Sequence, residues 1–210
     1  MSAVAVAPPF AAPAAPRDSL PPAFLYAAIA RCDRSELEPV LRATPVPRTV
    51  LALGPAAPEM ARALRVAGIA TTTLARDPDR EPDIIAPIDS IPAEPGQWDI
   101  AVCGPGFERL ALDRFAPALR ELHRVVGRSL VLSLPERSSP TWLPAILSRR
   151  PVAQPTTTRW MLGERSTPLH AVTAIMEVAG WRVEDTWTIK ATDRSAPRRG
   201  FVLHRVPEAA

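Results

Sequence analysis

The hydrophobic and polar positions of the chain alternate between two periods from residue 49 onward. Short apolar or β-branched runs, the pattern of strands, occupy residues 49–53, 69–74, 83–88, 98–103 and 129–134. Apolar residues at helical spacing predict helices at residues 59–67, 112–126 and 168–179. Because strands that alternate with helices form parallel sheets, these elements predict an α/β fold.

The alternation changes near the end of the chain. Residues 181–189 and 201–206 are predicted strands, and only a basic turn at residues 194–200 separates them. Strands joined without a helix pair as an antiparallel hairpin. The whole pattern therefore predicts a Rossmann-like, seven-stranded, mostly parallel sheet with a C-terminal antiparallel hairpin.

The remaining segments set the domain organisation. Residues 1–22 are rich in Ala and Pro and carry little charge, which predicts a disordered or extended tail before a single domain at residues 23–210. Residues 137–167 have no clear period and contain several prolines together with Trp142 and Trp160. A long aperiodic segment with two large aromatic residues predicts an insertion that caps the domain.

Composition narrows the classes of function. The formal net charge is +3, and the basic residues are scattered rather than gathered in one helix or run, so a nucleic-acid partner is not expected. No apolar run reaches membrane-spanning length and the N-terminus lacks the pattern of a signal peptide, so we expect a cytoplasmic protein without a membrane partner. Cys32 and Cys103 lack metal-ligand spacing; no metal site is expected, and Cys103 is predicted to be buried in a strand.

The segment after the first predicted strand is typical of a nucleotide-binding turn. Gly54 follows the strand and precedes a helix, the layout that brings a helix N-terminus under a ligand. Pro55, Ala56 and Pro58 occupy positions where such turns usually have further glycines or small residues. Proline has no amide hydrogen, so this turn offers a ligand fewer donors.

The order of elements and several segments resemble the class I S-adenosylmethionine (SAM) dependent methyltransferases, within them the small bacterial type-11-like group. The resemblance covers about residues 49–206. The segments that carry it are VLALGPAAPEMARALRVAG, PDIIAPIDSIP, QWDIAVCGPGFERL, DRFAPALRELHRV with SLVLSLPE, and AGWRVEDTWTI with GFVLHR. The resemblance implies SAM as the cofactor and methyl transfer to a small or medium-sized acceptor.

The resemblance also implies a set of cofactor-binding positions, and several of them depart from the family pattern. The acidic place of the first strand is Ala52, and the place of the ribose-binding acid after the second strand is Ala75. The nearest carboxylate to that place is Asp77, while Asp89 is expected to meet the adenine edge. The predicted cofactor-binding residues are Gly54, Ala56, Asp77, Asp89, Cys103 and Gly104.

Acceptor recognition is expected from residues around the insertion. The candidate substrate residues are Glu108, Trp142, Trp160 and His170, and nearby Arg159 and Arg165 would add recognition of a carboxylate or phosphate. No catalytic acid–base pair is identified, and none is required, because methyl transfer from a sulfonium depends mainly on in-line positioning in a dry pocket.

Two functions remain open at this point. One is an active SAM-dependent methyltransferase with a small-molecule substrate. The other is a catalytically inactive, methyltransferase-like binding or scaffold protein with a protein partner, which the residues at positions 52, 58 and 75 favour.

Overall fold

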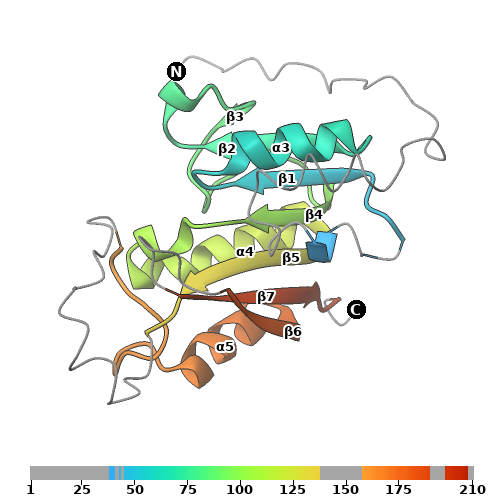
Figure 1. Cartoon of the computed structure of the whole chain (residues 1–210). Coiled ribbons are helices and arrows are strands. Elements are labelled where there is room, and N and C mark those ends of the chain that lie inside the picture. Colours follow the sequence, from blue (N-terminus) through green and yellow to red (C-terminus); the bar gives the residue numbers. More distant parts are fainter. Residues whose placement is uncertain (1–37, 41–42, 44, 138–157, 190–196, 208–210) are drawn as a thin grey trace.

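The computed structural model describes residues 38–40, 43, 45–137, 158–189 and 197–207, and these form a single mixed sheet covered by helices (Figure 1). The sheet has seven strands in the order β3-β2-β1-β4-β5-β7-β6. Strands β1 to β5 are parallel, and β7 runs antiparallel to both β5 and β6. The predicted seven-stranded, mostly parallel sheet with a C-terminal antiparallel hairpin is confirmed. The strands are β1 (Thr49–Leu53), β2 (Ala70–Ala75), β3 (Ile84–Ile85), β4 (Trp98–Cys103), β5 (Val126–Pro135), β6 (Trp181–Ile189) and β7 (Arg198–Arg205).

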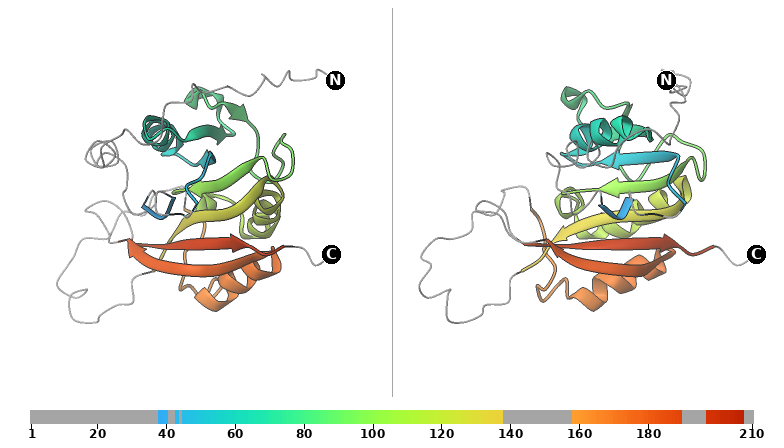
Figure 2. Two further views of the ribbon diagram at one scale, coloured as in Figure 1. Left: turned by 90° about the vertical axis from the view of Figure 1, so that its right-hand side faces the viewer. Right: turned by 45° about the vertical axis from the view of Figure 1, so that its right-hand side comes forward.

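Helices lie on both faces of the sheet, as the two views of Figure 2 show. Helix α3 (Ala57–Val66) covers one face, and helices α4 (Phe115–Val125) and α5 (Leu169–Val178) cover the other. The side chains of β1 alternate between these layers: Val50 and Ala52 pack with α3, whereas Leu51 and Leu53 pack with α4 and α5. Burial on both faces explains why the central strands are continuous apolar runs.

Strand β3 is shorter than the predicted 83–88. It contains only Ile84–Ile85. Asp83 lies before the strand, and its Oδ2 accepts hydrogen bonds from the amide (2.8 Å) and the hydroxyl (2.9 Å) of Thr73. Pro87 has no amide hydrogen to donate to a ladder, which is consistent with the early end of the strand.

The turn predicted at residues 194–200 is wrong for its last three residues. Arg198, Arg199 and Gly200 belong to β7 and pair with the end of β5. Gly200 lies opposite Trp187, and a Cβ at Gly200 would come within 2.2 Å of the indole ring. The glycine therefore makes room for an aromatic ring across the hairpin, although in the sequence it has the pattern of a turn residue.

Several predictions fall on residues that the structure does not describe. The tail at 1–22, Trp142 and most of the predicted cap at 137–167 lie outside the described ranges. Residues 38–40 are helical, and Val40 is buried in the core on the α3 side of the sheet. Within the described ranges, no helix is both long and apolar enough to cross a membrane.

Candidate ligand-binding site

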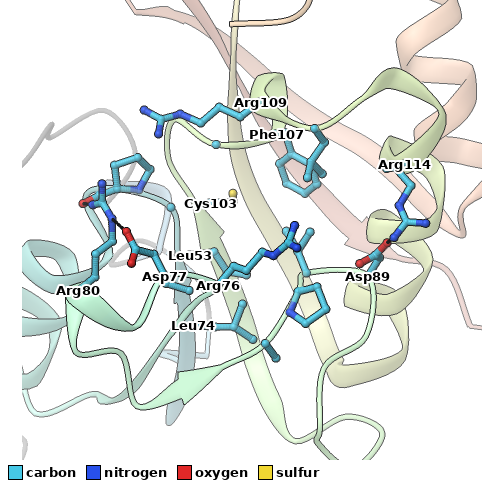
Figure 3. Close-up of a pocket in the computed structure, with 18 of the residues that line it drawn as sticks. Leu53, Leu74, Arg76, Asp77, Arg80, Asp89, Cys103, Phe107, Arg109 and Arg114 are labelled. Atoms are coloured by element: carbon cyan, nitrogen blue, oxygen red, sulfur yellow. Dashed lines mark hydrogen bonds and ion pairs between the residues drawn. The ribbon is translucent and has the colours of Figure 1, made fainter. Parts of the chain in front are cut away.

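A cavity of about 460 Å³ lies at the carboxyl edge of the parallel strands (Figure 3). Strand β1 pairs with β2 on one side and β4 on the other, so that Leu53 is in register with both Leu74 and Cys103. These three side chains come from the last part of each strand, and with Ala86 and Phe107 they form an apolar floor. The strand order runs from β1 to β2 and β3 on one side and through β4 and β5 on the other. This reversal beside β1 is the point at which open α/β sheets bind ligands.

Gly54 forms the turn between β1 and α3 at the edge of this cavity. Its φ is +94°, and a Cβ there would lie 2.6 Å from the carbonyl oxygen of Pro105. Only glycine fits this close approach of two backbone segments without displacing one of them. Gly106 approaches from the other segment, since a Cβ there would be 3.6 Å from Cα of Gly54 and 3.7 Å from Sγ of Cys103. Both glycines line the cavity, and one of its walls is therefore backbone.

The other predicted cofactor residues of the two turns differ in position. Cys103 is buried and lines the cavity, which agrees with its prediction as a buried strand residue. Pro55 also lines the cavity, whereas the described lining includes neither Ala56 nor Gly104.

Two carboxylates lie at the cavity wall, and both already have partners. Asp77 caps a short 3-10 turn, because its Oδ1 accepts from the amide of Asp79 at 3.1 Å. Its Oδ2 lies 3.9 Å from Nε of Arg80. Asp89 is largely buried and pairs with Arg114 at 2.5 Å between Oδ2 and Nη2. The structure thus brings Asp77 and Asp89 to one cavity, on either side of Leu74 in Figure 3.

Glu108 lies behind the cavity wall rather than at its mouth. The side chain is buried, and its Oε2 accepts from the amide of Gly106 at 2.9 Å. Arg198 lies 3.4 Å away and also donates to the carbonyl oxygen of Ser133 at 2.6 Å. Glu108 therefore connects the turn after β4 to the start of β7 and fixes the shape of that wall.

The predicted substrate residues do not gather in one place. Trp160 is buried, packs edge-on against Phe115 at 5.2 Å between ring centroids, and donates from Nε1 to the carbonyl of Leu110 at 3.1 Å. Leu110 lines the cavity, so Trp160 supports the wall from behind. His170 is exposed on α5 and is not among the residues that line the cavity.

Arginine is the commonest charged residue at the cavity mouth, a feature that sequence reasoning did not anticipate. All of the lining arginines are exposed, and only one of them, Arg159, stood out in the sequence. They are Arg76, Arg80, Arg109, Arg114 and Arg159, against two aspartates. In Figure 3 the Arg76 side chain extends over the middle of the pocket, between the Asp77–Arg80 and Asp89–Arg114 pairs.

The loop that follows Asp89 is held against α4 by a partly buried ion pair. Glu121 accepts from the amide of Ile91 at 2.7 Å and from Nη2 of Arg124 at 2.8 Å. Arg124 in turn donates to the carbonyls of Ile91 (2.9 Å) and Ala93 (2.7 Å). The hydrogen bond from Arg124, aided by the Ile91 amide and opposed by burial, lowers the pKa of Glu121.

No protein-family model matches the chain, and no curated protein matches it in sequence. Solved structures do match. A protein from Pyrococcus horikoshii is 14% identical, with a TM-score of 0.61 over 84% of this chain and 91% of that one. The 1,6-didemethyltoxoflavin-N1-methyltransferase of Burkholderia thailandensis is 13% identical, with a TM-score of 0.59 over 86% of this chain and 79% of that one.

The fold is that of the class I methyltransferases. The same fold also carries another chemistry, since SpnF, described as a [4+2]-cyclase, has a TM-score of 0.59 at 12% identity over 85% of this chain and 81% of that one. The Burkholderia enzyme was solved with 1,6-didemethyltoxoflavin and S-adenosylhomocysteine (SAH) bound. At these low identities the match establishes the class I methyltransferase fold alone. The ligand of this chain has to be inferred from its own residues.

Proposed function

We propose that the protein binds SAM in the cavity at the carboxyl edge of β1, β2 and β4 and transfers its methyl group to a small or medium-sized acceptor. One observation carries the proposal: the cavity is open beside the Gly54 turn, and neither Pro55 nor any neighbouring side chain fills it. Its volume of about 460 Å³ lies within the range of small-molecule sites.

The lining residues fit an adenosyl group in shape and in polarity. Leu53, Leu74, Ala86 and Phe107 would give the flat faces of an adenine ring their hydrophobic contacts. The backbone wall at Gly54 and Gly106 lets a ligand approach the main chain closely. The strand ends in Ala75, and the carboxylate of Asp77, two residues later, lines the cavity and is the candidate acceptor for a ribose diol.

SAM, if bound against Leu53, Gly54 and Cys103, would supply an electrophilic methyl group on a sulfonium, with the thioether SAH as the leaving group. The apolar floor would shield the lower part of a bound ligand from water. The buried Glu108–Arg198 contact holds the wall formed by residues 104–109 in one position. In the proposed function, the lining side chains bind and orient the cofactor and the acceptor, and methyl transfer needs no acid–base pair.

The second candidate is a binding or scaffold protein that has kept the cavity and lost the cofactor. Ala75 provides no carboxylate for a ribose, and Pro58 removes an amide from the first turn of α3. The two lining carboxylates are engaged by Arg114 and by the turn at Asp79. Each of these features lowers the affinity expected for an adenosyl ligand.

Titration of the full chain with SAM and SAH by calorimetry and thermal shift separates the two candidates. A ligand present at ten times its Kd stabilises the protein by about 1.4 kcal/mol. We expect Ile88→Trp, at a half-buried position in the lining, to abolish binding. The matched control is Ile85→Trp, at an exposed position outside the lining, which should bind normally. Absence of binding by the unmodified chain at millimolar ligand would refute the methyltransferase proposal and leave the scaffold candidate.

A further inference from the structure

Two arginines from distant parts of the sequence line the cavity from adjacent backbone segments. Arg109 ends the 3-10 turn that follows β4, and Arg159 belongs to the segment that returns to the sheet before α5. The amide of Arg159 donates to the carbonyl oxygen of Glu108 at 2.8 Å, which places the two segments side by side. Both arginine side chains are exposed and line the cavity.

No carboxylate of the described residues pairs with either guanidinium. The adjacent acid, Glu108, is buried and turned toward Gly106 and Arg198. The cavity's own carboxylates, Asp77 and Asp89, lie with Arg80 and Arg114. Two cations that line one cavity without a counter-charge favour a bound anion, which offsets their mutual repulsion and accepts charge-assisted hydrogen bonds from them.

The backbones that carry the two guanidiniums are fixed from behind. The Glu108 carboxylate holds the Gly106 amide, and the indole of Trp160 donates to the carbonyl of Leu110 at 3.1 Å. Each arginine is thus flanked by a buried residue that is anchored in the wall. Because the backbone is already held in place, ligand binding has to order only the two arginine side chains, and less conformational entropy is lost.

We propose that Arg109 and Arg159 form an anion-binding pair and that the acceptor of the methyltransferase reaction, on which this inference rests, is a small molecule bearing a carboxylate or a phosphate. The planar guanidinium matches the geometry of both groups in a bidentate contact. The apolar side chains of Phe107 and Leu110 line the cavity beside the pair and suit the uncharged part of such a molecule. Arg76, which also has no ion pair with another described residue, adds to the positive potential that attracts anions to the mouth.

The test compares three probes of similar shape: benzoate, phenyl phosphate and the neutral benzamide. Each is titrated into the full chain by NMR or calorimetry, with SAH titrated separately. The variant is Arg109→Gln with Arg159→Gln. The matched control is Arg120→Gln with Arg182→Gln, which removes the same charge from two exposed arginines outside the cavity.

We expect at least one anion to bind about tenfold more tightly than benzamide, since a single charge-assisted contact supplies that much. The Arg109→Gln/Arg159→Gln variant should lose at least that tenfold advantage. The control variant should bind the anions, and both variants should bind SAH, with affinities within about twofold of those of the unmodified chain. The benzoate and phenyl phosphate arms then identify which anion the acceptor carries.

Three results would overturn the inference: anions that bind no better than benzamide, an equal loss in the control variant, or a loss of SAH affinity as large as the loss for the anions. The last would assign the pair to the cofactor instead of the acceptor. Anion binding that needs Arg109 and Arg159 in a chain that does not bind SAH would support the anion pair and refute the proposed methyl transfer.

Discussion

Replacing Ala75 by aspartate should strengthen the binding of an adenosyl ligand. Ala75 is the last residue of β2 and lines the cavity; under the proposed function, a carboxylate at this position would meet the ribose diol. Its carbonyl accepts from the amide of Ala86 at 3.1 Å, so the backbone at this position is held in the sheet. A carboxylate there would accept two charge-assisted hydrogen bonds from the diol.

The size of the gain follows from the surroundings of Ala75. A hydrogen bond to a charged group contributes about 1.5–3 kcal/mol when the site is well shielded. Position 75 is only half-buried, and the exposed guanidiniums of Arg76 and Arg80 at the same rim compete for the new carboxylate. We therefore assign about 1.5 kcal/mol to the diol as a whole, which is about a tenfold decrease in Kd.

Calorimetric titration with SAH and with adenosine measures this gain. Ala75→Asn is the matched control, because it has nearly the same size without the charge, and it should give less than half of the gain in free energy. Substituting 2′-deoxyadenosine for adenosine removes one hydroxyl and should reduce the gain of the aspartate variant. A folded Ala75→Asp protein whose SAH affinity is unchanged or weaker would show that the ribose does not lie at the end of β2, and the placement of the cofactor would be wrong.

Two further predictions concern the stability of the fold. The stability that Glu121 contributes, through its lowered pKa, is present above its ordinary value near 4.5 and is lost as the pH falls through the folded-state value. Urea unfolding from about pH 6 to pH 3 should therefore show a steeper loss for the natural chain than for Glu121→Gln, and equal slopes would contradict the assignment. Gly68→Ala places a side chain at a φ of +76° in open space and should cost about 1 kcal/mol. Gly180→Ala combines a φ of +89° with a Cβ 2.7 Å from Nε2 of His123, so it should cost more, and an equal loss of stability in the two variants would refute this steric argument.

The sheet was predictable because its central strands are buried on both faces. Residues 50–53 and 130–132 are apolar without interruption, and helix α3 follows the first of these runs at the short distance that a parallel crossover allows. The ends of the sheet were less predictable. Asp83 belongs to a side-chain hydrogen-bond network with Thr73 rather than to β3, and Gly200 makes room for Trp187 inside β7. Both effects depend on residues that are distant in sequence or across a hairpin.

The charged part of the site could not be predicted from local pattern. The arginines that line the cavity come from the loop after β2, from two turns after β4 and from the segment before α5. Their proximity follows from sheet order, which brings separate strand ends to one edge, and not from any spacing between them. Glu108 was predicted as a substrate residue because it is acidic and follows β4. In the structure its carboxylate instead accepts from the Gly106 amide and pairs with Arg198.

The close contact between Gly54 and the Pro105 carbonyl changes what a glycine at this turn can reveal about activity. A chain that folds into this backbone must keep glycine there whether it binds a cofactor, another molecule or nothing, because the constraint comes from the protein's own main chain. Retention of that glycine in a related protein is thus uninformative about catalysis. The informative positions are those at which the backbone accepts many residue types, above all Ala75. A different residue there would indicate a different ligand.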